Sequence, residues 1–359
     1  MKHYNIAVIH GDGIGPEITD ATLAVIGAVA ARVGFGIDVK RVAGGARVYE
    51  EHGVPMLPEA VQAVRQADAT LKGPVGLPEV RMPDGTEAGM LGGVLRNGLD
   101  LYANVRPIRL YVGVKSALRD VTRGIDYVIV RENTEGLYAS RGKGVGNQWA
   151  VADTLIMTRP ACERIIKYAF ELAKQRDGAV ADGVRRVTLV DKANVLRSMF
   201  FFRTIFFEIA QQYLEIHAEC LHVDAAAQAL VIEPEHFDVL VTENLFGDIL
   251  SDLGGATVGG IAMCPAGNIG DDAAYFEPIH GSAPSIAGKQ VANPIGQILA
   301  AAMMFDHLGE GMGAELIREG VASALDSGRV TVEADGRVAG GPLAVAEAVI
   351  GSVEALQPE

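Results

Sequence analysis

Basic residues and cysteines are scarce in this chain of 359 residues. The 31 lysines and arginines are outnumbered by 45 aspartates and glutamates, so the net charge is −14. Such a chain repels nucleic acid and anionic membrane surfaces, and we therefore expect a small-molecule partner. The 3 cysteines, Cys162, Cys220 and Cys264, are far apart and form no C-x-x-C pair, which argues against a zinc knuckle and a disulfide framework.

Long apolar runs are missing too. No stretch approaches the roughly 18 apolar residues that a membrane-spanning helix needs. The N-terminus has no basic segment followed by an apolar run, so no secretory signal peptide is expected. Together with the isolated cysteines, these absences predict a cytoplasmic protein.

The dinucleotide-binding fingerprint is absent, although the chain begins with a similar pattern. "HGDGIGPEI" (10–18) follows an apolar run, but its glycines are spaced G-x-G-x-G rather than G-x-G-x-x-G. No acidic residue ends a second strand before Asp38. Pro16 and Glu17 suit the first turn of a helix, so the spacing favours an ordinary strand-to-helix turn over a phosphate-binding one.

Strand and helix patterns alternate along the chain, which predicts an α/β protein. The strand candidates are 5–9, 126–130, 187–190 and 237–241. A helix is expected over 159–176, with Thr158 as its N-cap and Pro160 in its first turn. Near the C-terminus, Asp335-Gly336 between valine-rich segments predicts a hairpin turn. No linker or repeat divides the chain, so any domains should share a continuous core.

The stretch 199–210, "MFFFRTIFFEIA", is rich in phenylalanine. It is too short to span a membrane, and it carries Arg203 and Glu208. One interpretation is a helix buried within the monomer. The other is a helix with apolar residues on more than one face, which must also pack against a partner.

Two carboxylates indicate a possible metal site. Asp248 and Asp252 in "ENLFGDILSDLGG" (243–255) are four residues apart, so on a helix they share one face. Carboxylate oxygens are the ligands that Mg²⁺ and Mn²⁺ prefer, and the surrounding apolar residues indicate partial burial. A solvated acidic edge is the alternative.

Basic side chains suggest an anion-binding site. Arg96, Arg106 and Arg109 lie in "LRNGLDLYANVRPIR" (95–109), and Arg131 opens "RENTEGLY". A guanidinium group binds carboxylate or phosphate oxygens in pairs, although each arginine alone could be part of a structural ion pair. Lys192 follows an apolar strand, where desolvation could leave its amine unprotonated at neutral pH, so that it can act as a base.

Together, these motifs are typical of one family. With "GDGIGPE", "LKGP", "LDLYANVRP", "RENTEGLY", "DKANVL", "ENLFGDILSDL", "GNIGD" and "EPIHGSAP", the chain resembles the β-decarboxylating dehydrogenases of isocitrate, homoisocitrate, 3-isopropylmalate, tartrate and D-malate. The resemblance implies an α/β fold of the isocitrate/isopropylmalate dehydrogenase type, in which two α/β domains share a large mixed sheet, and not a Rossmann fold. Residues 1–102 and 257–359 would form the cofactor-side domain. Residues 103–256 would form the central domain, which dimerises.

The resemblance also implies active sites shared between the subunits of a homodimer. Three arginines would clamp the malate carboxylates: Arg96, Arg106 and Arg131. Mg²⁺ or Mn²⁺ would be held by Asp248, Asp252 and, from the partner, Asp224. Lys192, also from the partner, would take the hydroxyl proton. Hydride would pass to the nicotinamide, CO₂ would be lost while the metal stabilises the enolate, and Tyr138 would protonate C3.

NAD is the cofactor that the resemblance favours. The cofactor-binding residues would be Glu277, His280, Gly281, Ser282, Ala283, Pro284, Ser285, Ile286 and Asn293. NADP-using isocitrate relatives carry Lys-Tyr directly after the "HG-x-AP" loop, and NAD-using relatives carry Asp-Ile. Ser285-Ile286 offers nothing to a 2′-phosphate but lacks the carboxylate that holds a 2′-hydroxyl, so we expect NAD to be preferred and NADP to be used weakly.

Substrate choice depends on the residues before the first clamp arginine, which read the C3 substituent in this family. Met90, Gly92 and Gly93 in "GMLGGVLR" offer no charged side chain for a third carboxylate, and the glycines leave space. A 3-isopropylmalate-like substrate is therefore predicted first, with isocitrate, homoisocitrate, tartrate and D-malate as alternatives. A non-catalytic regulatory subunit is a further alternative, which the filled catalytic positions disfavour. The chain departs from the family at Ala225, at Ser285 and in its C-terminal segment.

Overall fold

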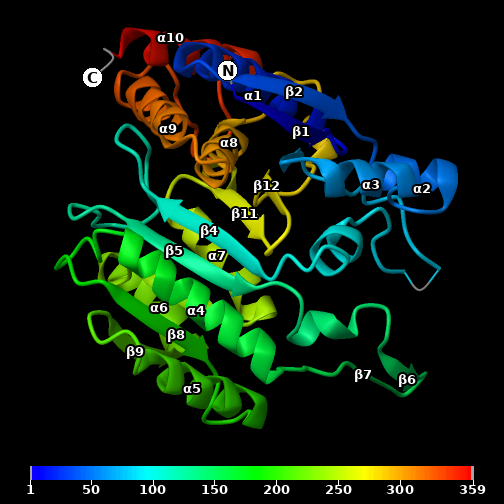
Figure 1. Ribbon diagram of the computed structural model, residues 1–359, viewed down its shortest axis with the longest axis vertical. Coiled ribbons are helices and arrows are strands. Elements are labelled where there is room, and N and C mark those ends of the chain that lie inside the picture. Colours follow the sequence, from blue (N-terminus) through cyan, green and yellow to red (C-terminus); the bar gives the residue numbers. More distant parts are fainter. Residues whose placement is uncertain (1, 84, 357–359) are drawn as a thin grey trace.

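One mixed sheet of ten strands runs through the computed structural model, which describes residues 2–83 and 85–356 (Figure 1). In spatial order the strands are β2 (Gly36–Arg41), β1 (His3–Ile9), β3 (Ala69–Lys72), β12 (Ala274–Pro278), β11 (Pro265–Ile269), β4 (Ala103–Arg109), β5 (Asp126–Glu132), β10 (Val239–Thr242), β8 (Arg186–Asp191) and β9 (His217–His222). Two short strands, β6 (Val145–Asn147) and β7 (Ala150–Ala152), form a separate ribbon. The four predicted strands are confirmed as β1, β5, β8 and β10.

Helices cover both faces of the sheet (Figure 1). They are α1 (Gly15–Val33), α2 (Ala46–His52), α3 (Pro58–Gln66), α4 (Arg159–Gln175), α5 (Arg197–Ala210), α6 (Val223–Ile232), α7 (Asn244–Thr257), α8 (Ile295–His307), α9 (Gly311–Asp326) and α10 (Gly341–Ala355). A π-helical turn spans Gly93–Asn97, and 3₁₀ turns span Leu137–Ser140, Pro234–His236, Ile261–Met263 and Pro284–Ile286. Within the described residues, no helix is long and apolar enough to cross a membrane.

Strand direction distinguishes this sheet from that of a Rossmann fold. Strands β2, β1, β3 and β12 are mutually parallel, as are β5, β10, β8 and β9. Between these groups, β11 and β4 pair antiparallel to each other and to their outer neighbours. The prediction of a large mixed sheet is therefore confirmed.

Consecutive side chains of β5, β10 and β8 point to opposite faces of the sheet, and both faces are buried. Val128, Val130 and Val241 pack toward α4 and α5, whereas Ile129 and Leu240 pack toward α6 and α7. The predicted helix over 159–176 is confirmed as α4, because Thr158 Oγ1 accepts a hydrogen bond from the third residue of the helix, and Cys162 and later apolar residues are buried.

The glycine-rich turn at 11–15 holds two other loops together. A Cβ at Gly11 would lie 2.0 Å from the Pro74 carbonyl oxygen, and one at Gly13 would lie 2.0 Å from the Ser282 carbonyl oxygen. The buried Asp12 carboxylate accepts hydrogen bonds from the backbone N–H groups of Ala46 and Gly76, both at 2.8 Å. These contacts explain the glycine spacing without a phosphate, as the sequence favoured.

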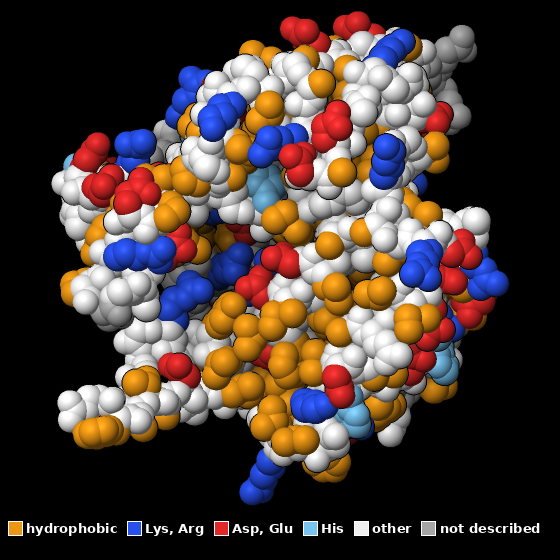
Figure 2. Space-filling view, turned by 180° about the vertical axis from the view of Figure 1, so that it is seen from behind, with side chains coloured by type: hydrophobic (Ala, Val, Ile, Leu, Met, Phe, Trp, Pro, Cys, Tyr) orange, Lys and Arg blue, Asp and Glu red, His pale blue; other side chains and the backbone are white. Residues whose placement is uncertain are grey.

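The phenylalanine-rich helix α5 is apolar on two faces. Phe202 and Phe206 are fully buried against α4, but 60% of Phe200 and 41% of Phe207 are exposed. The interpretation of a helix buried entirely within the monomer is therefore wrong. Figure 2 shows hydrophobic side chains gathered over the half of the molecule that contains α5, α6 and α7.

The predicted hairpin turn near the C-terminus is confirmed. Val332 and Val338 form an antiparallel bridge, and Gly336 adopts a positive φ of 81°. Both valines are buried, so the hairpin is anchored to the core rather than projecting from it.

Candidate active site

Two buried arginines lie on neighbouring strands and face one helix. Arg131, near the end of β5, donates to Asn244 Oδ1 at 3.0 and 2.7 Å and pairs with Asp248. Arg106 on β4 donates to Ser251 Oγ at 2.6 Å and lies 3.3 Å from Asp248 Oδ1. Burial, together with the charge of Arg106, lowers the pKa of Arg131 to about 9, although Asp248 opposes this shift. A second anion beside these guanidinium groups would therefore be stabilised.

The third predicted clamp arginine, Arg96, is held by β12. Its Nε donates to Tyr275 Oη at 2.9 Å, and its Nη2 lies 3.1 Å from Glu277 Oε1. The other Glu277 oxygen lies 2.6 Å from Lys72 Nζ, with both side chains buried. Burial would raise the pKa of Glu277, but Lys72 and Arg96 outweigh it and hold that pKa far below its usual value. Glu277 is thus an anion that fixes two cations at the cleft.

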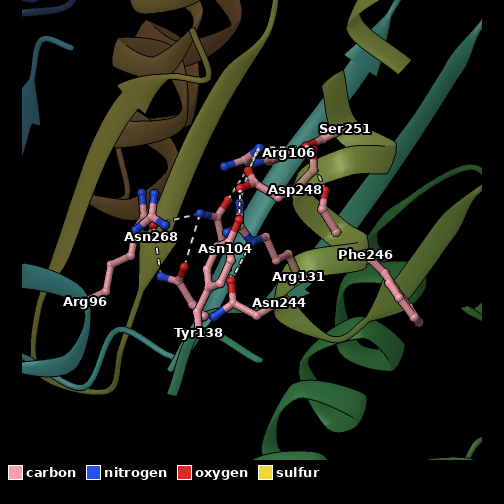
Figure 3. A network of polar contacts seen from close by, with 12 residues as sticks. Arg96, Asn104, Arg106, Arg131, Tyr138, Asn244, Phe246, Asp248, Ser251 and Asn268 are labelled. Atoms are coloured by element: carbon pink, nitrogen blue, oxygen red, sulfur yellow. Dashed lines mark hydrogen bonds and ion pairs between the residues drawn. The ribbon is translucent and has the colours of Figure 1, made fainter. Parts of the chain in front are cut away.

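A row of asparagines connects these groups across three strands (Figure 3). Arg106 Nε donates to Asn104 Oδ1 at 2.9 Å, and the amide of Asn104 donates to Asn268 Oδ1 at 2.9 Å. Asn268 then donates to Glu277 Oε1 at 3.0 Å, while Asn133 donates to Asn268 at 3.0 Å. The predicted clamp arginines therefore belong to one buried network, which fixes their orientation.

Helix α7 presents the predicted metal pair beside this network. Asp248 Oδ2 accepts a hydrogen bond from Tyr138 Oη at 2.9 Å. Burial would raise the pKa of Asp248, but Arg131 and Arg106 keep it below its usual value. By contrast, the Asp252 carboxylate has no hydrogen-bond or ion-pair partner in the described chain, and burial raises its pKa. A divalent cation that prefers oxygen ligands fits this pair.

The remaining predicted polar residues lie apart from that pair. Lys192, after β8, donates to Asp224 Oδ1 at 2.6 Å, and this bond lowers the pKa of Asp224. No hydrogen bond or ion pair connects either residue to Tyr138 or α7 within residues 2–83 and 85–356. In the same described part of the chain, no three His, Cys, Asp or Glu side chains gather as a metal site. The described residues of this chain therefore place no third acidic side chain beside Asp248 and Asp252.

Two cavities meet at the arginine cluster. The first, of about 320 Å³, is lined by the clamp arginines, Tyr138, Asp248, Met90, Gly92, Glu277 and His280. The second, of about 360 Å³, extends past Gly92 and Gly93. Both are lined by Arg141, whose guanidinium lies over the Tyr138 ring at 5.4 Å from the centroid. Figure 2 shows basic side chains gathered in a hollow near the middle of one face.

The predicted cofactor loop borders the first cavity. His280 is buried, its Nδ1 lies 2.8 Å from the Gly281 carbonyl oxygen, and burial lowers its pKa, so the ring is neutral at pH 7. Ser282 donates to the Gly76 carbonyl, whereas Ser285 is exposed and Ile286 half-buried. The remaining members, Ala283 and Pro284, form the turn between them.

Both polar atoms of the Asn293 side chain form hydrogen bonds within the protein. Its Oδ1 accepts from the Ile295 N–H at 3.0 Å at the start of α8, and its Nδ2 donates to the Gly336 carbonyl at 3.2 Å. It thereby connects the loop to the C-terminal hairpin.

Several residues of the network were missed from the sequence. Lys72 and Asn268 lie in "LKGP" and "GNIGD", so their motifs did carry a signal. Tyr275 is two residues before Glu277 on β12 and therefore shares its face, which strand periodicity could have indicated. Asn104 and Asn244 also lie in quoted motifs, "LDLYANVRP" and "ENLFGDILSDL". Neither was singled out, because an asparagine beside an apolar segment is as consistent with a turn or a helix end.

Comparison with known proteins agrees with this geometry. The isocitrate/isopropylmalate dehydrogenase family profile matches residues 5–339. The chain is 42% identical to a 3-isopropylmalate dehydrogenase of Halalkalibacterium halodurans over 98% of both chains. It is 40% identical to a 3-isopropylmalate/3-methylmalate dehydrogenase of Methanocaldococcus jannaschii over 93% of this chain and 95% of that protein.

A solved structure supports the same family. The isocitrate dehydrogenase from Methylococcus capsulatus superposes with a TM-score of 0.86 at 38% identity, covering 98% of this chain and 99% of that one. The chain therefore belongs to the isocitrate/isopropylmalate dehydrogenase family of decarboxylating dehydrogenases.

Proposed function

We propose that this protein oxidises and decarboxylates a 3-substituted malate, with NAD as hydride acceptor and 3-isopropylmalate as the first candidate substrate. The observation that carries the proposal is the convergence of Arg96, Arg106 and Arg131 on one cavity beside Tyr138 and Asp248. Three guanidinium groups suit a substrate with two carboxylates, because each carboxylate can be bound in a bidentate manner. The relatives named for 3-isopropylmalate support that substrate.

Asp248 and Asp252 would hold Mg²⁺ or Mn²⁺, which would act as a Lewis acid toward the substrate oxygens when bound. Because the described residues of one chain bring only this pair together, a third acidic ligand would come from elsewhere. Asp224 of a partner subunit is the candidate, and Lys192 lies 2.6 Å from it in the same chain. The Lys192 amine would take the hydroxyl proton of the substrate.

Tyr138 would deliver the proton to C3. Its hydroxyl is held by Asp248 at 2.9 Å, and its ring lies beneath the guanidinium groups of Arg131 and Arg141. These contacts fix the ring at the edge of the first cavity. A positioned phenol of this kind can act as a general acid.

We propose two domains, 1–102 with 257–359, and 103–256. The strand order supports this division, since one half of the sheet is built from β1, β2, β3, β11 and β12 and the other from β4, β5, β8, β9 and β10. The exposed apolar side chains of α5 support dimerisation through the central domain. The loop His280–Ile286 would contact the cofactor. Glu277 would orient Lys72 and Arg96 next to that loop.

Turnover tests this proposal. Purified protein with Mg²⁺ should form NADH from 3-isopropylmalate, and kcat/KM should be compared with isocitrate, homoisocitrate, tartrate and D-malate. A regulatory subunit would form no NADH from any of them, whereas a strong preference for isocitrate would contradict the substrate assignment.

A further inference from the structure

Helix α7 begins with a long, charged N-cap. Glu243 is the N-cap residue, and its Oε1 accepts a hydrogen bond from the Phe246 N–H at 2.7 Å. Serine, threonine, aspartate and asparagine are the preferred residues at this position, because a short side chain already reaches the first turn. The longer Glu243 side chain is fully buried, so its second carboxylate oxygen lies against another part of the protein.

That part is the loop that carries Tyr138. Glu243 Oε2 faces Gly136, where an added Cβ would lie only 2.5 Å from it. Gly136 has a positive φ of 75° and is the N-cap of the 3₁₀ turn Leu137–Ser140. The close approach therefore needs a glycine at 136 and a long side chain at 243. One carboxylate thus joins the first turn of α7 to the start of the turn that contains Tyr138.

Asn244 strengthens the same connection. Its Nδ2 donates to the Glu135 carbonyl at 3.1 Å, and its Oδ1 accepts from Arg131. Backbone hydrogen bonds also join Gly136 to Ile156, but Ile156 belongs to the segment before α4 and not to α7. The start of α7 is therefore the joint between a clamp arginine and the loop that carries Tyr138.

The Tyr138 residue is held at two points by α7. Its hydroxyl donates to Asp248, further along the helix, and its backbone follows Gly136 by two residues. Asp248 is also a proposed metal ligand, so its oxygens would be shared when Mg²⁺ is bound. The contact at Glu243 uses no atom of that carboxylate and is independent of the metal.

We infer that Glu243 is a positioning residue for the proton transfer to C3, because its carboxylate fixes the loop that aims Tyr138 at the substrate. This inference rests on the proposed function, in which Tyr138 delivers that proton. Hydride transfer from C2 depends on other groups, so a displaced Tyr138 should slow the protonation more than the oxidation. A misplacement of about 1 Å can cost about 100-fold in rate.

Two conservative substitutions separate capping from positioning. Glu243→Asp keeps a good N-cap, but its side chain is one methylene shorter, so its carboxylate would withdraw from Gly136. Glu243→Gln keeps the length and one acceptor oxygen. A residue that only caps α7 would tolerate Glu243→Asp at least as well as Glu243→Gln, whereas a positioning residue requires the reverse order.

The decarboxylated product allows the C3 protonation to be measured by itself. From 3-isopropylmalate this product is 4-methyl-2-oxopentanoate, whose C3 hydrogens exchange with deuterium in D₂O when the enzyme removes and returns a proton. NMR with Mg²⁺ and NADH follows the exchange, and single-turnover NADH formation follows hydride transfer. Glu243→Asp should slow the exchange about 10-fold or more but NADH formation less than about 2-fold. Glu243→Gln should keep both rates within about 3-fold.

Val321→Ala, at a buried position of α9, is the control for stability, because it should lower the melting temperature without changing the ratio of the two rates. Tyr138→Phe is the positive control and should lose the exchange. An unchanged ratio in Glu243→Asp, or an equal loss of both rates, would overturn the inference. Exchange that persists in Tyr138→Phe would contradict the role of Tyr138 in the proposed function, and the inference would fall with it, so the two failures are distinguishable.

Discussion

At the scale of single residues, Glu277 is expected to contribute strongly to stability, because it forms two buried ion pairs. Its carboxylate is the counterion of Lys72 and Arg96, and removing one partner from buried ion pairs leaves a charge without compensation. Glu277→Gln should therefore lower the free energy of unfolding by about 3–5 kcal/mol, measured in urea. Glu235→Gln, which affects an ion pair with the exposed Arg123, should cost less than about 1 kcal/mol.

Glu277 also predicts a dependence on pH. Because its pKa is lowered by folding, its contribution is complete above the unfolded value of about 4.3 and is lost as the pH falls below it. Unfolding free energy measured from pH 6 down to pH 3 should fall more steeply for the wild type than for Glu277→Gln. Parallel curves would contradict this assignment.

Asp252 has no hydrogen-bond or ion-pair partner among the described residues, which suits a metal ligand. Asp252→Asn should weaken Mg²⁺ binding by more than about 10-fold and remove most of the turnover, because a charged oxygen ligand is lost. Chelation should abolish turnover in the wild type. The rise in melting temperature on adding Mg²⁺ is a second measurement, and Asp120→Asn, at an exposed turn, should leave that rise intact. Full turnover in chelator would remove the metal from the mechanism.

Ser285 lies where NAD-using relatives carry a carboxylate. Ser285→Asp should provide an acceptor for the 2′-hydroxyl of NAD and repel the 2′-phosphate of NADP. A hydrogen bond contributes about 1 kcal/mol, so the preference for NAD should increase several-fold. Ser285→Ala should change that preference little. Initial rates with NAD and NADP at saturating substrate give the ratio, and a wild-type kcat/KM higher with NADP would contradict the cofactor assignment.

At the scale of elements, the turn between β1 and α1 holds the loops at 72–76 and 280–284. Gly13 has a φ of 59°, and a Cβ there would lie 2.0 Å from a carbonyl oxygen of the second loop. Gly13→Ala should therefore cost more than about 2 kcal/mol and raise the KM for NAD. Gly27→Ala in α1, where a Cβ meets nothing within 4 Å, should be neutral or stabilising by up to about 1 kcal/mol. Thermal unfolding and cofactor titration of both variants check this.

At the scale of the whole molecule, the described residues of one chain do not bring a third acidic side chain to Asp248 and Asp252. If Lys192 and Asp224 serve the site of a partner, a mixture of Lys192→Ala and Asp248→Ala proteins should regain activity after subunit exchange, because one hybrid site would be intact. Each variant alone should be inactive. Mass spectrometry would first show that the subunits have exchanged. If activity does not recover in the exchanged mixture, the active sites are not shared.

The sequence by itself determined the fold class and much of the candidate site. Short apolar runs identified β1, β5, β8 and β10, because strands covered on both faces bury consecutive residues, and the helical period of buried residues identified α4. Spacing placed Asp248 and Asp252 on one helical face. The family motifs predicted the arginines that the structure gathers around the first cavity.

Only the tertiary structure decided how these parts meet. Asn104, Asn268 and Glu277 form one network because β4, β11 and β12 are adjacent in the sheet although distant in the chain. The guanidinium of Arg141 reaches Gly92 because a loop after β5 folds over the π-helical turn at 93–97, and no local pattern encodes such a contact. Pairing between distant strands and loops depends on the packing of the whole core. Hydrophobic periodicity and helix caps are local properties, so they can be identified in the sequence.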